Sequence, residues 1–325
     1  MTRLISIISA ILALTLPAVA GAAAPHPNGP IVFAGATAKQ GRGLWAWEAD
    51  WREPRQITSD PTDGDPQGSP NGRWIVFTRL GTTPGGEPSS TDIFLARTDG
   101  SQIVRVTSGH SDRSPSFSPS GKRILFARAE PRATRGFAAE PFSDEELTPE
   151  HIYSMRLDGT ELQQLTTGYF SDRNPVFSPN GRVIAFERCP LSQGCHLITM
   201  RPDGSGLHEA TPYLAAWSTE PAFSPTGNRI VFLRGHPDSP NSALFTMRPD
   251  GTGVRKLFGP SGHRLGGVSS PSWSPDGTRI VFQDTGANSS TLQVIRVRDR
   301  RLGATLGGPG FHRLPYWRTP VWLRR

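Results

Sequence analysis

Charged and polar side chains stand immediately before a recurring Pro-x-(Phe/Trp) motif, and their chemistry could support binding or catalysis. Carboxylates can act as general acids or bases, and arginine can bind a carboxylate through two parallel hydrogen bonds. The candidates in these segments are Asp65, Asp112, Arg113, Asp172, Arg173, Glu220, His312 and Arg313. If the motif repeats a structural unit, we expect these side chains to gather at the mouth of one channel.

The sequence leaves more than one role open for these residues. They could contact a ligand or a partner. Alternatively, Asp could cap its own loop and Arg could pair with an acid of a neighbouring unit. A hydrolase or lyase acting on a polysaccharide or a small substrate would need a carboxylate or metal cluster. The acids available for such a cluster are Asp65, Asp112, Asp172 and Glu220.

Several familiar catalytic patterns are missing from the sequence. It contains no Gly-x-Ser-x-Gly pentapeptide, which an α/β-hydrolase nucleophile requires. Its histidines show no His-x-His or His-x₃-His spacing that would favour a metal site. We therefore expect a protein without enzymatic activity, metal or cofactor.

A longer repeat surrounds the candidate residues. Its core is Ser-Pro-x-Gly-x-x-(Ile/Val)-x-Phe or a close variant, and Pro-x-(Phe/Trp) precedes most copies. The five copies occupy 69–77, 118–126, 178–186, 224–232 and 274–282. A second turn, with Asp-Gly as in "MRPDG" at 200–204 and 247–251, follows four of these cores. Such regular spacing predicts one small supersecondary unit per copy.

Each unit contains four short segments rich in Ile, Val and Phe, separated by Gly, Pro, Asn and Asp. This pattern predicts four antiparallel strands per unit, and a period of 40–50 residues with four strands is typical of a β-propeller blade. The predicted fold is therefore an all-β, six-bladed propeller over 25–325. The blade cores are 26–60, 63–107, 111–167, 171–211, 218–258 and 268–306.

The first of these blades lacks its own inner strand. The C-terminal segment 314–323 can supply it, because "LPYWRTP" at 314–320 echoes "SPSWSPD" at 270–276. We expect the last strand to complete the first blade and so to close the ring, which removes an exposed sheet edge.

The repeat resembles the WD40-like repeat of the TolB β-propeller family, which has the same Pro-x-Phe-Ser-Pro-Asp-Gly-x-x-Ile-x-Phe character. The resemblance covers about residues 26–323, and no counterpart of TolB's additional N-terminal α/β domain is expected. It implies a non-catalytic protein that receives a partner's segment at the channel through polar contacts. The expected partner is an envelope or secreted protein or peptide, or a cell-wall glycan.

Residues needed once per unit are predicted to be structural. Ser118, Pro119, Gly121, Asp158 and Gly159 suit tight turns, since Gly permits positive φ and Asp caps turn backbone. The Phe of each core should pack between neighbouring blades. These residues are Phe77, Phe126, Phe186, Phe232 and Phe282.

The N-terminus predicts export. Arg3 precedes a largely apolar run from Leu4 to Leu16, and Ala18-Val19-Ala20 follows with small residues suited to cleavage. We expect 1–24 to be a cleaved signal peptide and the protein to be secreted, periplasmic or envelope-bound. No other segment is long and apolar enough to enter a membrane, so we expect no membrane insertion.

The two cysteines and the net charge complete the sequence-based expectations. Cys189 and Cys195 enclose a short Pro/Gly loop, which predicts a local disulfide in an exported protein. The charge of +7 comes mainly from scattered arginines without a basic run. We therefore expect no nucleic-acid binding. We expect a monomer.

Overall fold

The structure is a computed structural model of the chain. It describes residues 28–37, 41–48, 54–82, 88–130, 149–190, 194–212, 216–235, 242–259, 266–286, 289–306 and 318–324. The expected signal peptide and the candidates His312 and Arg313 lie outside these residues. Over the described ranges, no helix is long and apolar enough to cross a membrane.

The strands of the described residues form four four-stranded sheets and one eight-stranded sheet. The first sheet has the order β24 (Arg318–Arg324), β1 (Asn28–Thr37), β2 (Gly41–Trp47), β3 (Arg55–Gln56). The second runs β4 (Gly64–Gly68), β5 (Trp74–Thr82), β6 (Pro88–Arg97), β7 (Ile103–Arg105). Two others run β16 (Trp217–Phe223), β17 (Ile230–Gly235), β18 (Ala243–Met247), β19 (Arg255–Phe258) and β20 (Gly266–Trp273), β21 (Arg279–Gly286), β22 (Ser289–Arg296), β23 (Leu302–Leu306).

The eight-stranded sheet departs from the expectation of separate four-stranded blades. It contains β8 (Asp112–Phe117), β9 (Arg123–Ala129), β10 (Glu150–Arg156), β11 (Gln163–Gln164), β12 (Phe170–Phe177), β13 (Ile184–Pro190), β14 (His196–Met200) and β15 (His208–Glu209). The join is one parallel pairing of Glu150 with Ser171, between β10 and β12. The other strand pairings in this sheet are antiparallel.

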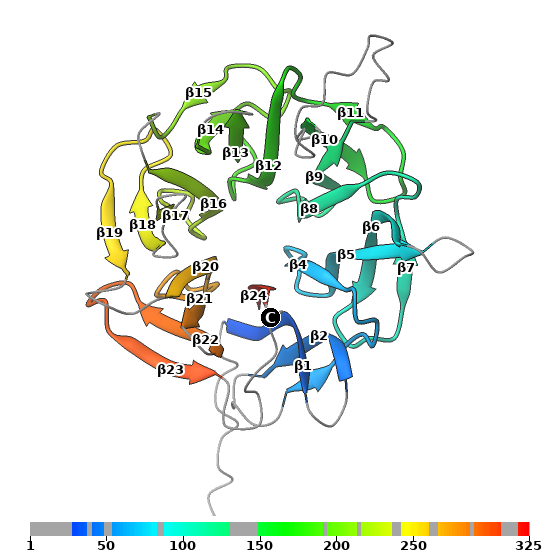
Figure 1. Cartoon of the computed structure of the whole chain (residues 1–325), viewed down its shortest axis with the longest axis horizontal. Coiled ribbons are helices and arrows are strands. Elements are labelled where there is room, and N and C mark those ends of the chain that lie inside the picture. The colour runs from blue at the N-terminus through cyan, green and yellow to red at the C-terminus, as the bar shows by residue number, and fades with distance from the viewer. Residues whose placement is uncertain are drawn as a thin grey trace, which may run out of the picture.

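The sheets are arranged around a central opening, with β4, β8, β12, β16, β20 and β24 nearest to it (Figure 1). The all-β propeller arrangement predicted from the repeat is thus confirmed. Each sheet is small and twisted outward from these inner strands. Because the inner strands all face the opening, residues at equivalent repeat positions lie around one central channel.

Aromatic and aliphatic side chains of the repeat form the core between neighbouring sheets. Phe126, for example, packs with Val76 and Ile93 of the preceding unit, and Phe232 packs with Ala185. The five repeated phenylalanines are fully buried, as predicted: Phe77, Phe126, Phe186, Phe232 and Phe282. Burial of a Phe side chain contributes about 1.5–3 kcal/mol, so these contacts hold successive units together.

The C-terminal strand pairs with the N-terminal one, as the repeat predicted, but in a different register. Strand β24 runs antiparallel to β1. Pro320 lines the same cavity as Pro271, and Trp322 lines the next cavity beside Trp273. The motif equivalent to "PSW" is therefore Pro320-Val321-Trp322 and not the one at 315–317. The tail contains two Pro-x-Trp motifs, and pairing with β1 selects the second.

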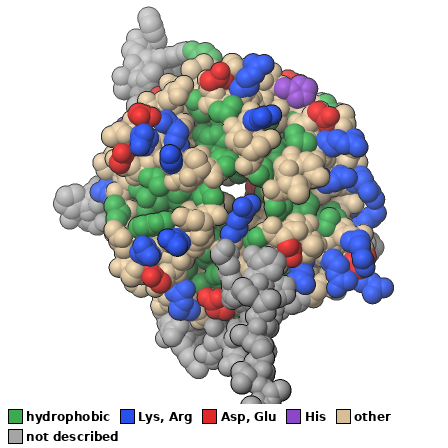
Figure 2. Space-filling view, turned by 180° about the vertical axis from the view of Figure 1, so that it is seen from behind, with side chains coloured by type: hydrophobic (Ala, Val, Ile, Leu, Met, Phe, Trp, Pro, Cys, Tyr) green, Lys and Arg blue, Asp and Glu red, His purple; other side chains and the backbone are tan. Residues whose placement is uncertain are grey.

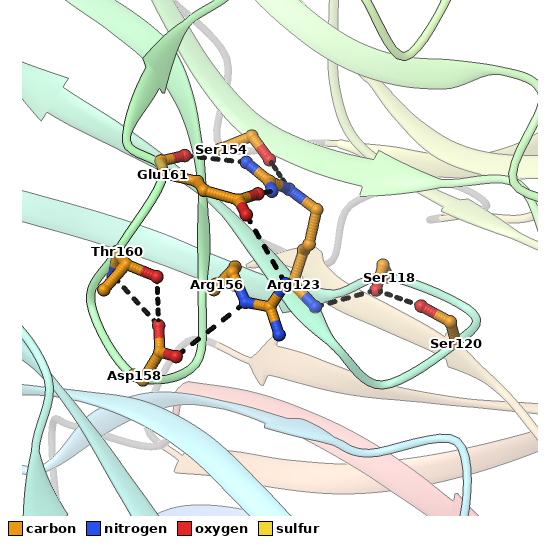
Figure 3. Close-up of polar contacts among 8 residues, drawn as sticks. All are labelled: Ser118, Ser120, Arg123, Ser154, Arg156, Asp158, Thr160 and Glu161. Atoms are coloured by element: carbon orange, nitrogen blue, oxygen red, sulfur yellow. Dashed lines mark hydrogen bonds and ion pairs between the residues drawn. The ribbon is translucent and has the colours of Figure 1, made fainter.

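Turns at the far ends of the inner strands have the chemistry predicted for them. The Ser118 hydroxyl accepts a hydrogen bond from the Arg123 backbone N–H at 3.1 Å, and Gly121 has φ of 68°. In the second turn, Asp158 accepts bonds from the Thr160 N–H and hydroxyl at 3.0 and 2.6 Å. Figure 3 shows both turns and Glu161, which joins them through Arg123. These polar groups stabilise the scaffold.

One face of the ring is largely hydrophobic around the central opening (Figure 2). In Figure 2 hydrophobic side chains surround much of the central hole, and Lys and Arg side chains lie mainly toward the rim. Lys and Arg side chains also reach the edge of the hole, so on this face they are scattered and not gathered in one patch (Figure 2).

Candidate binding site at the channel mouth

Five of the inner strands share an unusual backbone conformation at one internal position. Five non-glycine residues directly before the strand proline have φ between 48° and 53°: Asp65, Ser114, Asn174, Glu220 and Ser270. Each lies at a register shift, or bulge, between the inner strand and the next one. Non-glycine residues seldom adopt this left-handed conformation, and clusters of such outliers occur at functional sites. We refer to these five as the mouth residues.

The mouth residues line one cavity of about 420 Å³ in the channel. Four of the prolines that follow the mouth residues, together with Gln67 and Gln283, also line this cavity. Among the described residues, no Lys, Arg or His lines this cavity. The mouth is therefore polar and acidic, although the whole chain is basic.

Two carboxylates connect the mouth residues of successive units. Glu187 accepts hydrogen bonds from the Asn174 side-chain amide at 2.9 Å and from the Glu220 backbone N–H at 3.1 Å. Glu220 in turn accepts a short hydrogen bond from the Ser270 backbone N–H. Each acid thus fixes the left-handed residue of the next unit, which gives the mouth a defined shape.

Burial changes the ionisation of both acids. It raises the pKa of the Glu187 carboxyl, although its hydrogen bonds and Arg173 oppose the shift. It raises the pKa of Glu220 to about 7, with further contributions from the negative charges of Glu187 and Asp65. Glu220 therefore exchanges a proton near neutral pH, and the charge of the mouth depends on pH.

Asp112 and Asp172, which were predicted as candidate partner contacts, do not line this cavity. Both are fully buried. Asp112 binds Arg128 through two hydrogen bonds of 2.6 and 2.9 Å, and Asp172 binds Arg188 at 2.7 and 2.8 Å. These contacts support a structural role for both acids.

The same Asp–Arg pair occurs in a third unit, where Asp63 binds Arg79 at 2.6 and 2.9 Å. Each arginine also stacks on two aromatic rings, as Arg128 does on Phe126 and Tyr153 at 5.2 and 5.3 Å. We call this arrangement the Asp–Arg clamp. It joins an Asp two residues before a mouth residue to an Arg of the neighbouring strand.

Arg113 and Arg173 converge on one buried acid, Glu150. Arg173 donates a short hydrogen bond to it, and Arg113 lies 3.6 Å from its other oxygen. The two guanidinium groups remain partly exposed, with side-chain exposures of 54% and 37%. Arg113 lines a separate cavity of about 500 Å³ together with Asp63 and Asp65. These arginines pair with a neighbouring element's acid, as the structural interpretation expected, and keep an exposed edge.

The remaining candidates divide as follows. Asp65 and Glu220 are mouth residues. Cys189 and Cys195 form the predicted disulfide, between the end of β13 and the start of β14. In the part of the chain that the structure describes, no group of three His, Cys, Asp or Glu residues could hold a metal ion.

Sequence reasoning missed the importance of Ser114, Asn174 and Ser270, and of Glu187 below them. The usable signal was the position directly before each strand proline. The Asp-Arg pair is the more conspicuous pattern because both residues are charged and appear twice, whereas the mouth position carries a different side chain in almost every unit.

Comparison with known proteins supports the fold. A scan of the sequence against protein-family models gave no match. An uncharacterized protein of Agrobacterium fabrum is 33% identical over 138 residues, which cover 40% of this chain and 46% of that protein. The matched region therefore spans less than half of the relative's length.

Two solved structures share the arrangement of the strands. TolB from Acinetobacter baumannii superposes with a TM-score of 0.70 at 18% identity, over 91% of this chain and 67% of that one. Oligogalacturonate lyase from Vibrio parahaemolyticus superposes with a TM-score of 0.55 at 10% identity, over 87% and 82%. Identities this low establish a shared fold without a shared activity. The chain has the β-propeller fold that TolB also has.

Proposed function

We propose that this chain is an exported, six-bladed propeller that binds a segment of another envelope or secreted protein at the channel mouth. The count of six treats the eight-stranded sheet as two four-stranded units, β8 to β11 and β12 to β15. Export rests on the N-terminal sequence pattern. Under this proposal the protein is a non-catalytic binding module.

The ring of mouth residues carries this proposal. A repeated, left-handed backbone presents Asp65, Ser114, Asn174, Glu220 and Ser270 to one cavity. The side chains differ, while the conformation does not. A rigid scaffold that displays varied polar groups is suited to recognition, because binding then requires little ordering of the protein. The TolB-like fold supports the same reading.

Site-directed cross-linking tests the proposal. Both native cysteines are in the disulfide, so a single added cysteine can be labelled selectively. Ser114→Cys places a benzophenone maleimide at the mouth, and Ser120→Cys places it on a turn at the other end of the same hairpin. After irradiation in the envelope and secreted fractions of the source cells, we expect a discrete protein adduct from position 114 only.

Competition makes the outcome specific. Unlabelled wild-type protein should suppress the adduct, and unlabelled Ser114→Gly/Ser270→Gly protein should suppress it less. The same adducts from both positions, or none from position 114, would contradict binding of a protein at the mouth.

The pKa of Glu220 favours one second candidate, a hydrolase or lyase. A carboxyl with a pKa of about 7 in a cavity has the ionisation that a general acid or base needs. The fold likeness to an oligogalacturonate lyase points to an acidic oligosaccharide as the first substrate to assay. Turnover that Glu220→Gln abolishes would establish this alternative, and absence of turnover by folded wild-type protein would exclude that substrate.

A further inference from the structure

One unit retains the arginine of the Asp–Arg clamp without its acid. At the position of Asp112 and Asp172, the unit β16 to β19 has Ser218. The arginine that would complete the clamp is present as Arg234, at the end of β17. The two residues pair across β16 and β17 in the same register as Asp112 with Arg128.

The guanidinium of Arg234 is held in position without a carboxylate. It lies 5.3 Å from the centre of the Phe232 ring and 5.3 Å from that of Phe245, which reproduces the stacking of Arg128. Its Nε lies 3.4 Å from the Ser218 hydroxyl, at the long limit for a hydrogen bond. Among the described residues, no acid forms an ion pair with it.

This environment is unfavourable for a cation alone. Burial lowers the pKa of the Arg234 guanidinium, and no neighbouring charge opposes the shift. A partly buried cation without a carboxylate costs free energy that an incoming anion can recover. The aromatic rings fix the planar group in advance, so that little side-chain entropy is lost when an anion binds.

We propose that Arg234 is a carboxylate-binding site for an aspartate or glutamate side chain of a partner protein. The same guanidinium geometry holds an Asp side chain in three other units of this molecule, so that group is the one whose fit is already demonstrated. Ser218 lies two residues from the mouth residue Glu220. Ser218 itself is buried, whereas Arg234 is half-buried, so a partner's acid would approach Arg234 from its solvent-exposed side. The inference goes beyond the proposed mouth site and does not require it.

Acetate, which matches the end of an Asp side chain, is the probe for this site. Titration of the full-length protein with sodium acetate at constant ionic strength should shift the Arg234 Nε–H signal in a saturable way. Arg234→Gln should remove the saturable response. Ser218→Asp should weaken acetate binding at least about tenfold, because it restores the internal clamp. Ser218→Asn introduces a side chain of nearly the same volume as Asp but without its charge, so it should weaken acetate binding much less than Ser218→Asp does.

Three results would overturn the assignment. The first is an absence of saturable acetate binding by the wild-type protein, and the second is equal binding by Ser218→Asp and the wild type. The third is saturable binding of galacturonate without binding of N-acetyl-aspartate amide, which would assign the site to an acidic glycan. If Ser218→Asp does not fold, acetate binding by Arg234→Gln and Arg234→Lys is compared instead. Lys keeps the charge without the planar guanidinium, so both variants should lose the saturable binding. Wild-type binding by Arg234→Lys would overturn the assignment.

Discussion

The Ser-Pro-x-Gly turns and the channel mouth lie at opposite ends of the same inner strands, and they use their residues differently. In the turns, the Ser hydroxyl accepts a hydrogen bond from the backbone N–H five residues later in all five copies, at 2.9 to 3.1 Å. At the mouth, the backbone conformation repeats while the side chain changes from Asp to Ser, Asn and Glu.

This difference separates scaffold from candidate site. A side chain that makes the same bond in each unit is required by the fold, and its loss should cost stability. A side chain that varies on a fixed backbone is free to serve recognition. The Asp–Arg clamp belongs to the first class in three units. Ser218 with Arg234 keeps the arginine alone, and Val268 with Asp284 keeps neither residue of the clamp.

The largest effect is expected from the clamp. Asp172→Asn leaves Arg188, whose side chain is only 12% exposed, without its counter-charge, and we expect a loss of about 3 kcal/mol in the free energy of unfolding. Urea unfolding followed by circular dichroism measures it. If Asp172→Asn loses no more free energy of unfolding than Ser178→Ala does, Asp172 is not required by the fold.

Removing the disulfide should have the next largest effect. Cys189→Ala/Cys195→Ala releases a short loop, and the chain-entropy relation predicts a loss of about 2 kcal/mol. The comparison is with wild-type protein in reducing agent, which should lose a similar amount. Unchanged stability in both would show that the loop is held by other contacts, such as the packing of Trp217 on Gly194.

A matched pair along one strand sharpens the comparison itself. Ser178→Ala removes a turn hydrogen bond and should cost about 1 kcal/mol. Ser114→Gly at the mouth should be nearly neutral or slightly stabilising, because Gly adopts the observed φ of 50° without strain. Equal losses for the two variants would remove the distinction between the ends of the strands.

The last comparison concerns pH. The pKa of Glu220 rises from 4.5 to about 7 on folding, so the folded state binds more protons than the unfolded state between these values. Stability therefore falls as pH rises through that window. Glu220→Gln cannot ionise and keeps an oxygen for the Ser270 N–H.

We expect Glu220→Gln to gain stability relative to the wild type as the pH rises from about 5 to about 8, because only the wild type must ionise this buried carboxyl. Urea midpoints of both proteins at the two pH values measure the difference. A variant that loses stability at the higher pH would contradict the direction of the pKa shift.

The propeller itself could be predicted from sequence because its determinants are local and repeated. Gly121 and Asp158 are needed in their turns, and Phe126 is needed between blades, so each recurs at a fixed spacing. The roles of Asp112 and Asp172 could not be predicted, because a bulge interrupts the alternation of the strand. The left-handed residue two positions later turns toward the channel, and the Asp turns into its own sheet.

Contacts between neighbouring units also could not be predicted from a single sequence. Glu187 reaches the neighbouring unit's Glu220 backbone, and Glu150 joins Arg113 to Arg173, although these residues are distant in the chain. The register of β24 also depended on pairing with β1, since the tail offers two similar motifs. Such features depend on how the units meet, and the repeat does not encode them at fixed spacing.

Two double variants on the same two strands test the central claim most directly. Ser114→Gly/Ser270→Gly removes mouth side chains, and Ser118→Ala/Ser274→Ala removes turn hydrogen bonds. For the partner captured at position 114, we predict that the mouth variant unfolds like the wild type and binds at least about tenfold more weakly. The turn variant should lose about 2 kcal/mol of stability and bind normally while folded. A mouth variant with wild-type affinity would contradict the account.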